Sequence, residues 1–275
     1  MCSIEGCGSQ TPMPPIKLSA PDRRSFLAGI IGLPLATVLA IPELAQAQAA
    51  RLAEIEIPTE NGGIARGVIA MPAKLPAPTV LLIHEWWGLN DQIKSVAAEL
   101  AALGYIALAV DLYDGKVATS ANGARGLMQA LDGSGAMDQL ATTVGYLREL
   151  NGSNGKVGTV GWCFGGGWSL NASIAAPVDA TVIYYGQVTQ PAVKLRKLSG
   201  PVMGHFGTRD QSINSNMVSG FAAEMTTAGK SDNLTVHWYD AHHAFANPTG
   251  SRYDQADAAL AWDRTLKFFT TNLQS

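Results

Sequence analysis

The sequence predicts an α/β fold in which a mostly parallel sheet of about eight strands carries helices on both faces. From about Arg51 onward, short apolar segments alternate with longer segments whose apolar residues recur at helical spacing. Repeated strand–helix units of this kind build parallel sheets. Some short segments, such as residues 79–83, are almost continuously apolar, which is typical of strands buried on both faces.

The predicted elements alternate along the chain, and local signals mark their ends. Strands are predicted at residues 52–57, 64–71, 79–83, 105–110, 157–161, 180–185, 202–206 and 234–239. Helices are predicted at residues 91–103, 136–150, 165–175, 213–228 and 254–273. The turn sequence Glu60-Asn61-Gly62-Gly63 separates the first two strands, and Gly104 ends the first helix. No internal repeat or linker divides residues 50–275, so we expect a single domain there.

The composition is that of a globular protein with one large core. The chain has 275 residues, of which 47% are hydrophobic and 15% are charged, and its formal net charge is -3. No basic stripe indicates a nucleic-acid partner, and no acidic tract indicates a solvated tail.

The first 49 residues have the features of an export leader. Arg23 and Arg24 precede an apolar run at residues 26–41, and small residues alternate with glutamine at 45–49. A charged start, an apolar middle and a small-x-small end are typical of an export signal, and the paired arginines indicate the twin-arginine variety. We expect export by the twin-arginine machinery, to the periplasm. The alternative is an uncleaved membrane anchor, although the run is shorter than the ~20 apolar residues of a span and contains Pro34.

Cys163 is the only cysteine outside this leader, because Cys2 and Cys7 lie within it. A lone thiol forms no intramolecular disulfide. In an oxidising compartment it is at risk unless it is buried or used. A small core residue is the alternative to a reactive one, so the local sequence has to decide.

The sequence around Cys163 is Gly161-Trp162-Cys163-Phe164-Gly165-Gly166-Gly167. It lies where a predicted strand meets a predicted helix. Small residues two positions before and after a nucleophile permit the sharp, strained turn called a nucleophile elbow. The helix N-terminus that follows favours a thiolate. The motif therefore predicts that Cys163 is a nucleophile, at the position that usually carries serine.

A histidine and an acid follow in the order that such an elbow requires. His243 lies in a loop after the last predicted strand, with His242 as the fallback. Asp210 follows the preceding strand and is expected to accept the other ring N–H of His243, although a turn or capping role is the alternative. Asp240 is the weaker candidate. The order nucleophile, acid, histidine is that of an α/β-hydrolase. Adjacent histidines also suggest metal binding, but no cysteine or carboxylate cluster completes such a site.

The loop after the strand at 79–83 reads His84-Glu85-Trp86-Trp87-Gly88-Leu89-Asn90. In this fold, one oxyanion-hole donor comes from this loop, and the other is the N–H that follows the nucleophile. The candidates are the backbone N–H groups of Trp86 and Phe164. Glu85 is a carboxylate in a mostly apolar loop, and its alternative role is a surface residue paired with a lysine.

Together these motifs resemble the dienelactone hydrolase (carboxymethylenebutenolidase) family over roughly residues 54–273. The supporting segments are residues 84–90, 111–113, 161–166, 207–210 and 243–245. The resemblance implies a triad of Cys163, Asp210 and His243, acyl-enzyme chemistry on a lactone or ester, and no metal or organic cofactor. It also implies that Glu85 lies against the thiol and helps to deliver the thiolate.

The resemblance extends less well to the substrate. The family's best-known lactone bears a carboxylate that arginines hold, whereas this chain has Asp114, Gly115 and Lys116 at one position and Asn247 at the other. Lys116 and Arg252 are the replacement cations that the sequence offers.

Two further classes of function compete with a hydrolase. They are a non-catalytic small-molecule binding protein on a hydrolase scaffold, and a thiol redox protein that uses Cys163 alone. The sequence leaves the substrate, the cleavage site of the leader and the oligomeric state open, with a monomer among the possibilities.

Overall fold

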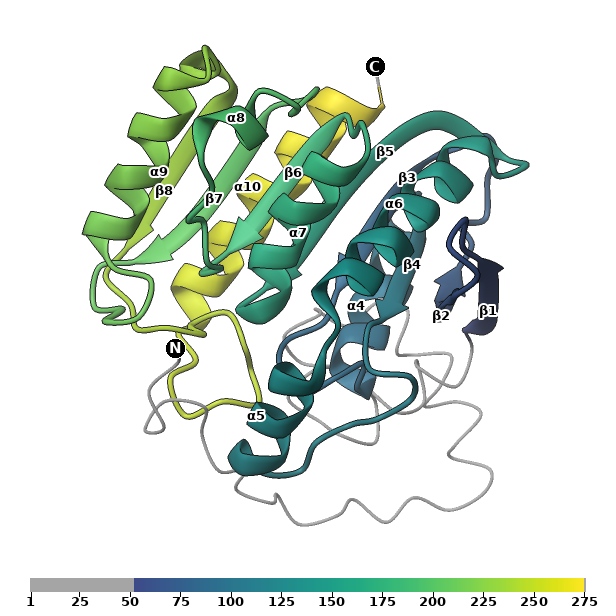
Figure 1. Cartoon of the computed structure of the whole chain (residues 1–275), viewed down its shortest axis with the longest axis horizontal. Coiled ribbons are helices and arrows are strands. Elements are labelled where there is room, and N and C mark those ends of the chain that lie inside the picture. Colours follow the sequence, from purple (N-terminus) through teal and green to yellow (C-terminus); the bar gives the residue numbers. More distant parts are fainter. Residues whose placement is uncertain (1–51, 275) are drawn as a thin grey trace.

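The computed structural model describes residues 52–274, so the predicted leader at 1–49 lies outside the described residues. Eight strands form one sheet in the order β1-β2-β4-β3-β5-β6-β7-β8. Helices cover both faces of this sheet (Figure 1). The predicted α/β fold with about eight strands is therefore confirmed.

The elements follow the predicted order closely. The strands are β1 (Ala53–Pro58), β2 (Ile64–Ala70), β3 (Ala77–Ile83), β4 (Ile106–Asp111), β5 (Ser153–Trp162), β6 (Ala180–Tyr184), β7 (Val202–Gly207) and β8 (Leu234–Tyr239). The helices are α4 (Asp91–Ala102), α5 (Ala121–Ala130), α6 (Gly133–Glu149), α7 (Phe164–Ala175), α8 (Ala192–Leu195), α9 (Ser215–Thr227), α10 (Gln255–Leu273) and the 3-10 turn η2 (Ser231–Asn233).

The sequence did not predict α5 or the short helix α8. Two glycines inside α5, Gly123 and Gly126, weaken its helical signal. Its N-cap Ser120 accepts a hydrogen bond from the N–H of Gly123, and Ala124 is its one fully buried residue. A side-chain cap of this kind stabilises a helix end by about 1 kcal/mol, so a local contact supports a helix that the apolar pattern does not mark.

The strand directions place the chemistry at one edge of the sheet. β1 pairs with β2, and β2 with β4, in antiparallel fashion. All other neighbouring pairs, from β4 through β3 and β5 to β8, are parallel. The carboxyl ends of these parallel strands therefore share one edge, where α/β proteins bind ligands.

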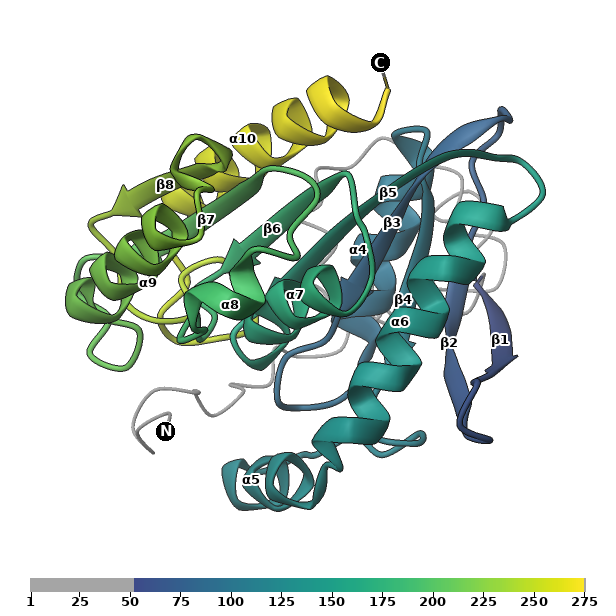
Figure 2. The same cartoon turned by 45° about the horizontal axis from the view of Figure 1, so that its top comes forward.

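Helices α4 and α10 pack on one face of the sheet, and α6, α7, α8 and α9 on the other (Figure 2). Every residue of β3 and β4 is buried between these layers, as their apolar runs predicted. The buried residues of α10 are Ala261, Thr265, Phe269 and Leu273. Their four-residue spacing gives the helix one buried stripe facing the sheet. Among residues 52–274, no helix has the length and apolar character needed to cross a membrane.

Candidate active site

Cys163 stands on a strained turn between β5 and α7. Its φ is 54° and its ψ is -115°, a conformation that side-chain-bearing residues rarely adopt. A Cβ atom on Gly161 would lie 2.0 Å from the carbonyl oxygen of Gly165. One on Gly165 would lie 2.2 Å from the carbonyl oxygen of Ile83. Glycine is therefore required at both positions, because the chain approaches itself too closely for any side chain.

His243 and Asp210 complete a hydrogen-bonded chain that begins at Cys163. His243 Nε2 lies 3.1 Å from Cys163 Sγ, and His243 Nδ1 lies 2.6 Å from Asp210 Oδ2. Each of the three residues is only 4% exposed. Because Asp210 is acceptor-only when ionised, Nδ1 carries a proton, which leaves Nε2 as the atom that faces the thiol.

Asp210 fills both of the roles that the sequence offered it. Its Oδ2 binds His243, while its Oδ1 accepts hydrogen bonds from the N–H groups of Ser212 at 2.8 Å and Ile213 at 2.9 Å. Burial acts to raise the pKa of Asp210. The hydrogen bond and charge of His243, together with the two N–H donors, lower this pKa by more than burial raises it. The net pKa lies below the ordinary value, so Asp210 remains a carboxylate that can stabilise an imidazolium.

His242 and Asp240, the alternatives to His243 and Asp210, do not take part in the hydrogen-bonded chain from Cys163. His242 is exposed, next to the buried His243. Asp240 is exposed and forms an ion pair with Arg209. Ala244, directly after His243, has a φ of 64°, and Phe245 is fully buried. The turn at Ala244 and the anchor at Phe245 direct His243, rather than His242, into the molecule.

Glu85 is buried, with 4% exposure, and is not the surface residue paired with a lysine that the sequence left open. Asn247 Nδ2 donates a hydrogen bond to Glu85 Oε2 at 2.7 Å. Burial first, and then the negative charges of Glu85 and Cys163, raise the pKa of Tyr185 well above its ordinary value. The carboxylate of Glu85 and the thiol of Cys163 therefore both lie near the phenol of Tyr185.

His84 anchors the loop that carries Glu85. Its Nδ1 lies 2.6 Å from the carbonyl oxygen of Glu85, and its Nε2 accepts from the N–H of Leu112 at 3.2 Å. These two partners fix the proton on Nδ1, because a carbonyl only accepts and an N–H only donates. Burial lowers the pKa of His84, which keeps the ring neutral. Sequence reasoning gave His84 no such role.

The two proposed oxyanion donors follow neighbouring strands of the sheet. Trp86 lies in the loop after β3, and Phe164 is the first residue of α7, just after β5. β3 and β5 pair in parallel, with Ile83 opposite Gly161. The backbone at Trp86 and Phe164 therefore reaches the same edge of the sheet as Cys163.

A cavity of about 230 Å³ lies beside the His243–Asp210 pair. Its lining is polar and consists of Arg209, Asp210, Gln211, Ser212, His242, His243 and Arg252. The Nε atom of Arg252 is buried and has no hydrogen-bond partner among the described residues. Lys116, the other cation that the sequence offered, is exposed and does not line this cavity.

The parallel sheet, the strained cysteine between β5 and α7, and the ordered aspartate and histidine define a hydrolase of the α/β-hydrolase class. The family model described as dienelactone hydrolase family matches residues 65–273. The chain belongs to this family.

Similar proteins span nearly the same length. Carboxymethylenebutenolidase of Pseudomonas putida is 32% identical and covers 78% of this chain and 94% of its own. Carboxymethylenebutenolidase 1 of Cupriavidus pinatubonensis is 28% identical with the same coverage. The solved structure of a dienelactone hydrolase-like promiscuous phosphotriesterase from metagenomic libraries has a TM-score of 0.72 at 23% identity, over 81% of this chain and 99% of that one. The fold is therefore shared even at low identity.

Proposed function

We propose that this protein hydrolyses a lactone or carboxylic ester through Cys163 and an acyl-enzyme intermediate. The observation that carries the proposal is the buried chain from Cys163 Sγ to His243 and on to Asp210 Oδ2. The names of the relatives, carboxymethylenebutenolidases, support a lactone as the substrate class.

The residues perform the reaction in two halves. The thiol proton passes to His243 Nε2, and the thiolate, at the N-terminus of α7, attacks the substrate carbonyl. The N–H groups of Trp86 and Phe164 receive the developing oxyanion. The C–O bond then breaks, the leaving alkoxide takes the proton from His243, and the acyl group remains on Sγ. Water, deprotonated by His243, cleaves this thioester and restores the thiol.

Asp210 and Glu85 act on the protons of this cycle. Asp210 holds the ring of His243 in the productive tautomer and stabilises the imidazolium. We assign to Glu85 the exchange of a proton with Cys163, which keeps the thiol protonated between turnovers and so protects it from oxidation. The charges of Glu85 and Cys163 both raise the pKa of Tyr185, which supports the placement of Glu85 near the thiol.

Arg252 is the cation that we propose meets an anionic group of the substrate. It lines the cavity beside His243, and its buried Nε lacks a partner among the described residues. The test is a pair of esters of equal size, one carrying a carboxylate and one neutral. Arg252→Ala should raise KM for the anionic ester about 10-fold or more and leave the neutral ester unchanged. An equal effect on both esters would contradict this role.

The decisive experiment for the function follows the mass of the intact protein during incubation with a panel of lactones and esters. An added acyl mass on Cys163 that decays with product release is expected. Cys163→Ala and His243→Ala should lose both the adduct and turnover, whereas the exposed neighbour His242→Ala keeps them. Full turnover in Cys163→Ala would overturn the proposal. Tight ligand binding without an adduct would instead support a non-catalytic binding protein, and a peroxide-induced sulfenate without turnover would support a redox role.

We also propose that residues 1–49 direct export to the periplasm through the twin-arginine machinery. Arg23 and Arg24 ahead of the apolar run support this proposal. Replacement of both arginines by lysine should retain the protein in the cytoplasmic fraction. The mass of the exported chain should give the cleavage position, and an uncleaved mass in the membrane fraction would favour the anchor.

A further inference from the structure

We infer that Asn247 is a positioning residue that sets the orientation and proton affinity of Glu85 through an uncharged, orientation-locked hydrogen bond. The inference rests on the proposed proton exchange between Glu85 and Cys163. It assigns a role to a residue that the sequence singled out only because an arginine was expected there.

The side-chain amide of Asn247 has a single possible orientation. Asn247 is 6% exposed, and one atom of its amide receives two donors from Thr249, the backbone N–H at 2.9 Å and Oγ1 at 2.7 Å. A backbone N–H only donates, so the atom that it meets is the amide oxygen. The NH₂ group must then face Glu85, which it contacts at 2.7 Å.

The backbone holds this amide in place from both sides. The N–H of Asn247 donates to the carbonyl of Ala244 at 3.0 Å, and the carbonyl of Asn247 accepts from the N–H of Gly250 at 3.1 Å. The same turn begins at His243. The residue that holds Glu85 and the residue that faces the thiol therefore belong to one short, tightly bonded loop.

The chemical character of the partner determines what Glu85 can do. A guanidinium or an ammonium at this position would compensate the carboxylate and lower its proton affinity. An amide gives one hydrogen bond without a charge, so Glu85 keeps more affinity for a proton. The phenol of Tyr185 lies near both Glu85 and Cys163, whose charges raise its pKa, and the neutral ring of His84 contacts the backbone carbonyl of Glu85. Asn247 thus helps to fix the pH at which the thiol proton is lost.

The test measures Cys163 directly rather than through turnover. The rate of alkylation by iodoacetamide, followed from pH 5 to pH 10, reports the thiolate without any ester substrate. Asn247→Asp places a second carboxylate against Glu85, so the midpoint of the alkylation profile should rise by about 1 pH unit or more. At neutral pH, this corresponds to about a 10-fold slower alkylation. Asn154→Asp is the matched control, because it makes the same change at the opposite end of β5 and should leave the profile unchanged.

A double-mutant comparison shows whether Asn247 acts through Glu85. Asn247→Ala should shift the alkylation profile in the native background and have no further effect in Glu85→Gln. Asn247→Gln, which retains the donor, should restore part of the native profile. Independent, multiplying effects of the two substitutions would overturn the inference, as would an unchanged profile in a folded Asn247→Asp protein. A failure of the proposed function would be seen in a different result, because Cys163→Ala would then retain its ester turnover.

Discussion

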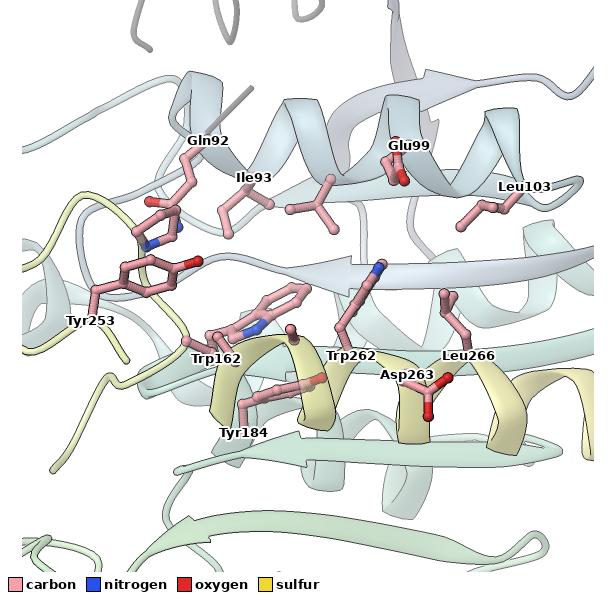
Figure 3. A pocket seen from close by; sticks show the side chains of 15 residues that line it. Gln92, Ile93, Glu99, Leu103, Trp162, Tyr184, Tyr253, Trp262, Asp263 and Leu266 are labelled. Atoms are coloured by element: carbon pink, nitrogen blue, oxygen red, sulfur yellow. The ribbon is translucent and has the colours of Figure 1, made fainter. Parts of the chain in front are cut away.

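Two hollows of this molecule differ in both size and polarity. One is the polar cavity of about 230 Å³ beside His243 and Asp210 at the carboxyl edge of the sheet. The other is an apolar groove of about 380 Å³ between α4 and α10. Figure 3 shows Ile93, Glu99 and Leu103 on the α4 side of this groove, with Trp262 and Leu266 on the α10 side. Trp162 and Tyr184 also line it.

At two places in the chain, one residue lines the groove and the next belongs to the catalytic site. Trp162 lines the groove, whereas Cys163 begins the catalytic chain. Ala246 lines the groove, whereas Asn247 binds Glu85. The larger hollow is apolar and the smaller site is where donors, acceptors and ionisable groups converge. The catalytic groups of this protein therefore lie where donors, acceptors and ionisable side chains converge, and not in the larger of the two cavities.

The largest expected effect is a difference in activity between a variant in the catalytic site and a variant in the groove. Cys163→Ala should lower kcat/KM by a factor on the order of 10⁴ or more, because no other group replaces the nucleophile. Trp162→Phe, one residue away on the groove side, should retain most of its turnover. Steady-state kinetics with an activated ester measures both. Comparable losses in the two variants would mean that groove and site act as one unit.

The next effect concerns Asp210 and its pH dependence. Asp210→Asn should lower kcat by about 10²–10⁴, because an amide can present the wrong hydrogen-bonding partner to His243 Nδ1. The pKa of native Asp210 is lowered, so its contribution to stability is present above the ordinary value near 3.8 and is lost as the pH falls through the folded pKa. Urea unfolding between pH 2 and pH 7 should show a weaker dependence on pH in the variant. Identical pH profiles would contradict the burial of a charged Asp210.

The sequence predicted the elements and residues whose signals are local. β3 and β4 are apolar runs. The glycines around Cys163 mark the elbow because a Cβ on Gly161 or Gly165 would lie near 2 Å from a carbonyl oxygen. The fixed order of nucleophile, acid and histidine then identified Asp210 and His243. These inferences need only neighbouring residues and a known strand order.

Other features depended on contacts that no local pattern reveals. Asn247 and Glu85 are 162 positions apart, and their hydrogen bond exists only because two loops meet at one edge of the sheet. His84 similarly owes its role to the N–H of Leu112, 28 positions away. The helix α5 was missed because its glycines mask its periodicity.

A smaller effect is expected for Tyr184, which lines the groove and contributes to stability rather than to catalysis. The hydroxyl of Tyr184 is 2.7 Å from Thr265 Oγ1, which also lies 3.1 Å from His205 Nε2. Tyr184→Phe removes one buried hydrogen bond and should lower the free energy of unfolding by about 1–2 kcal/mol. Urea unfolding gives this value, and kcat/KM per folded molecule should stay unchanged. A large loss of turnover would show that the floor of the groove also positions Cys163.

The smallest effect comes from Glu99, a carboxylate in the apolar groove. Burial raises its pKa, so the ionised form is disfavoured in the folded protein. Ionised Glu99 therefore subtracts from stability above its folded pKa, and this cost disappears as the pH falls below the ordinary value near 4.5. Glu99→Gln should raise Tm by about 1–2 °C at pH 7 and by nothing at pH 4. Thermal unfolding at the two pH values measures the difference, and a lower Tm at pH 7 would show that the carboxylate is favourably bound in the groove. Because kcat/KM should be unaffected, this variant separates the electrostatics of the groove from those of Asp210, where the hydrogen bonds and the charge of His243 outweigh burial and give the net pKa shift the opposite sign.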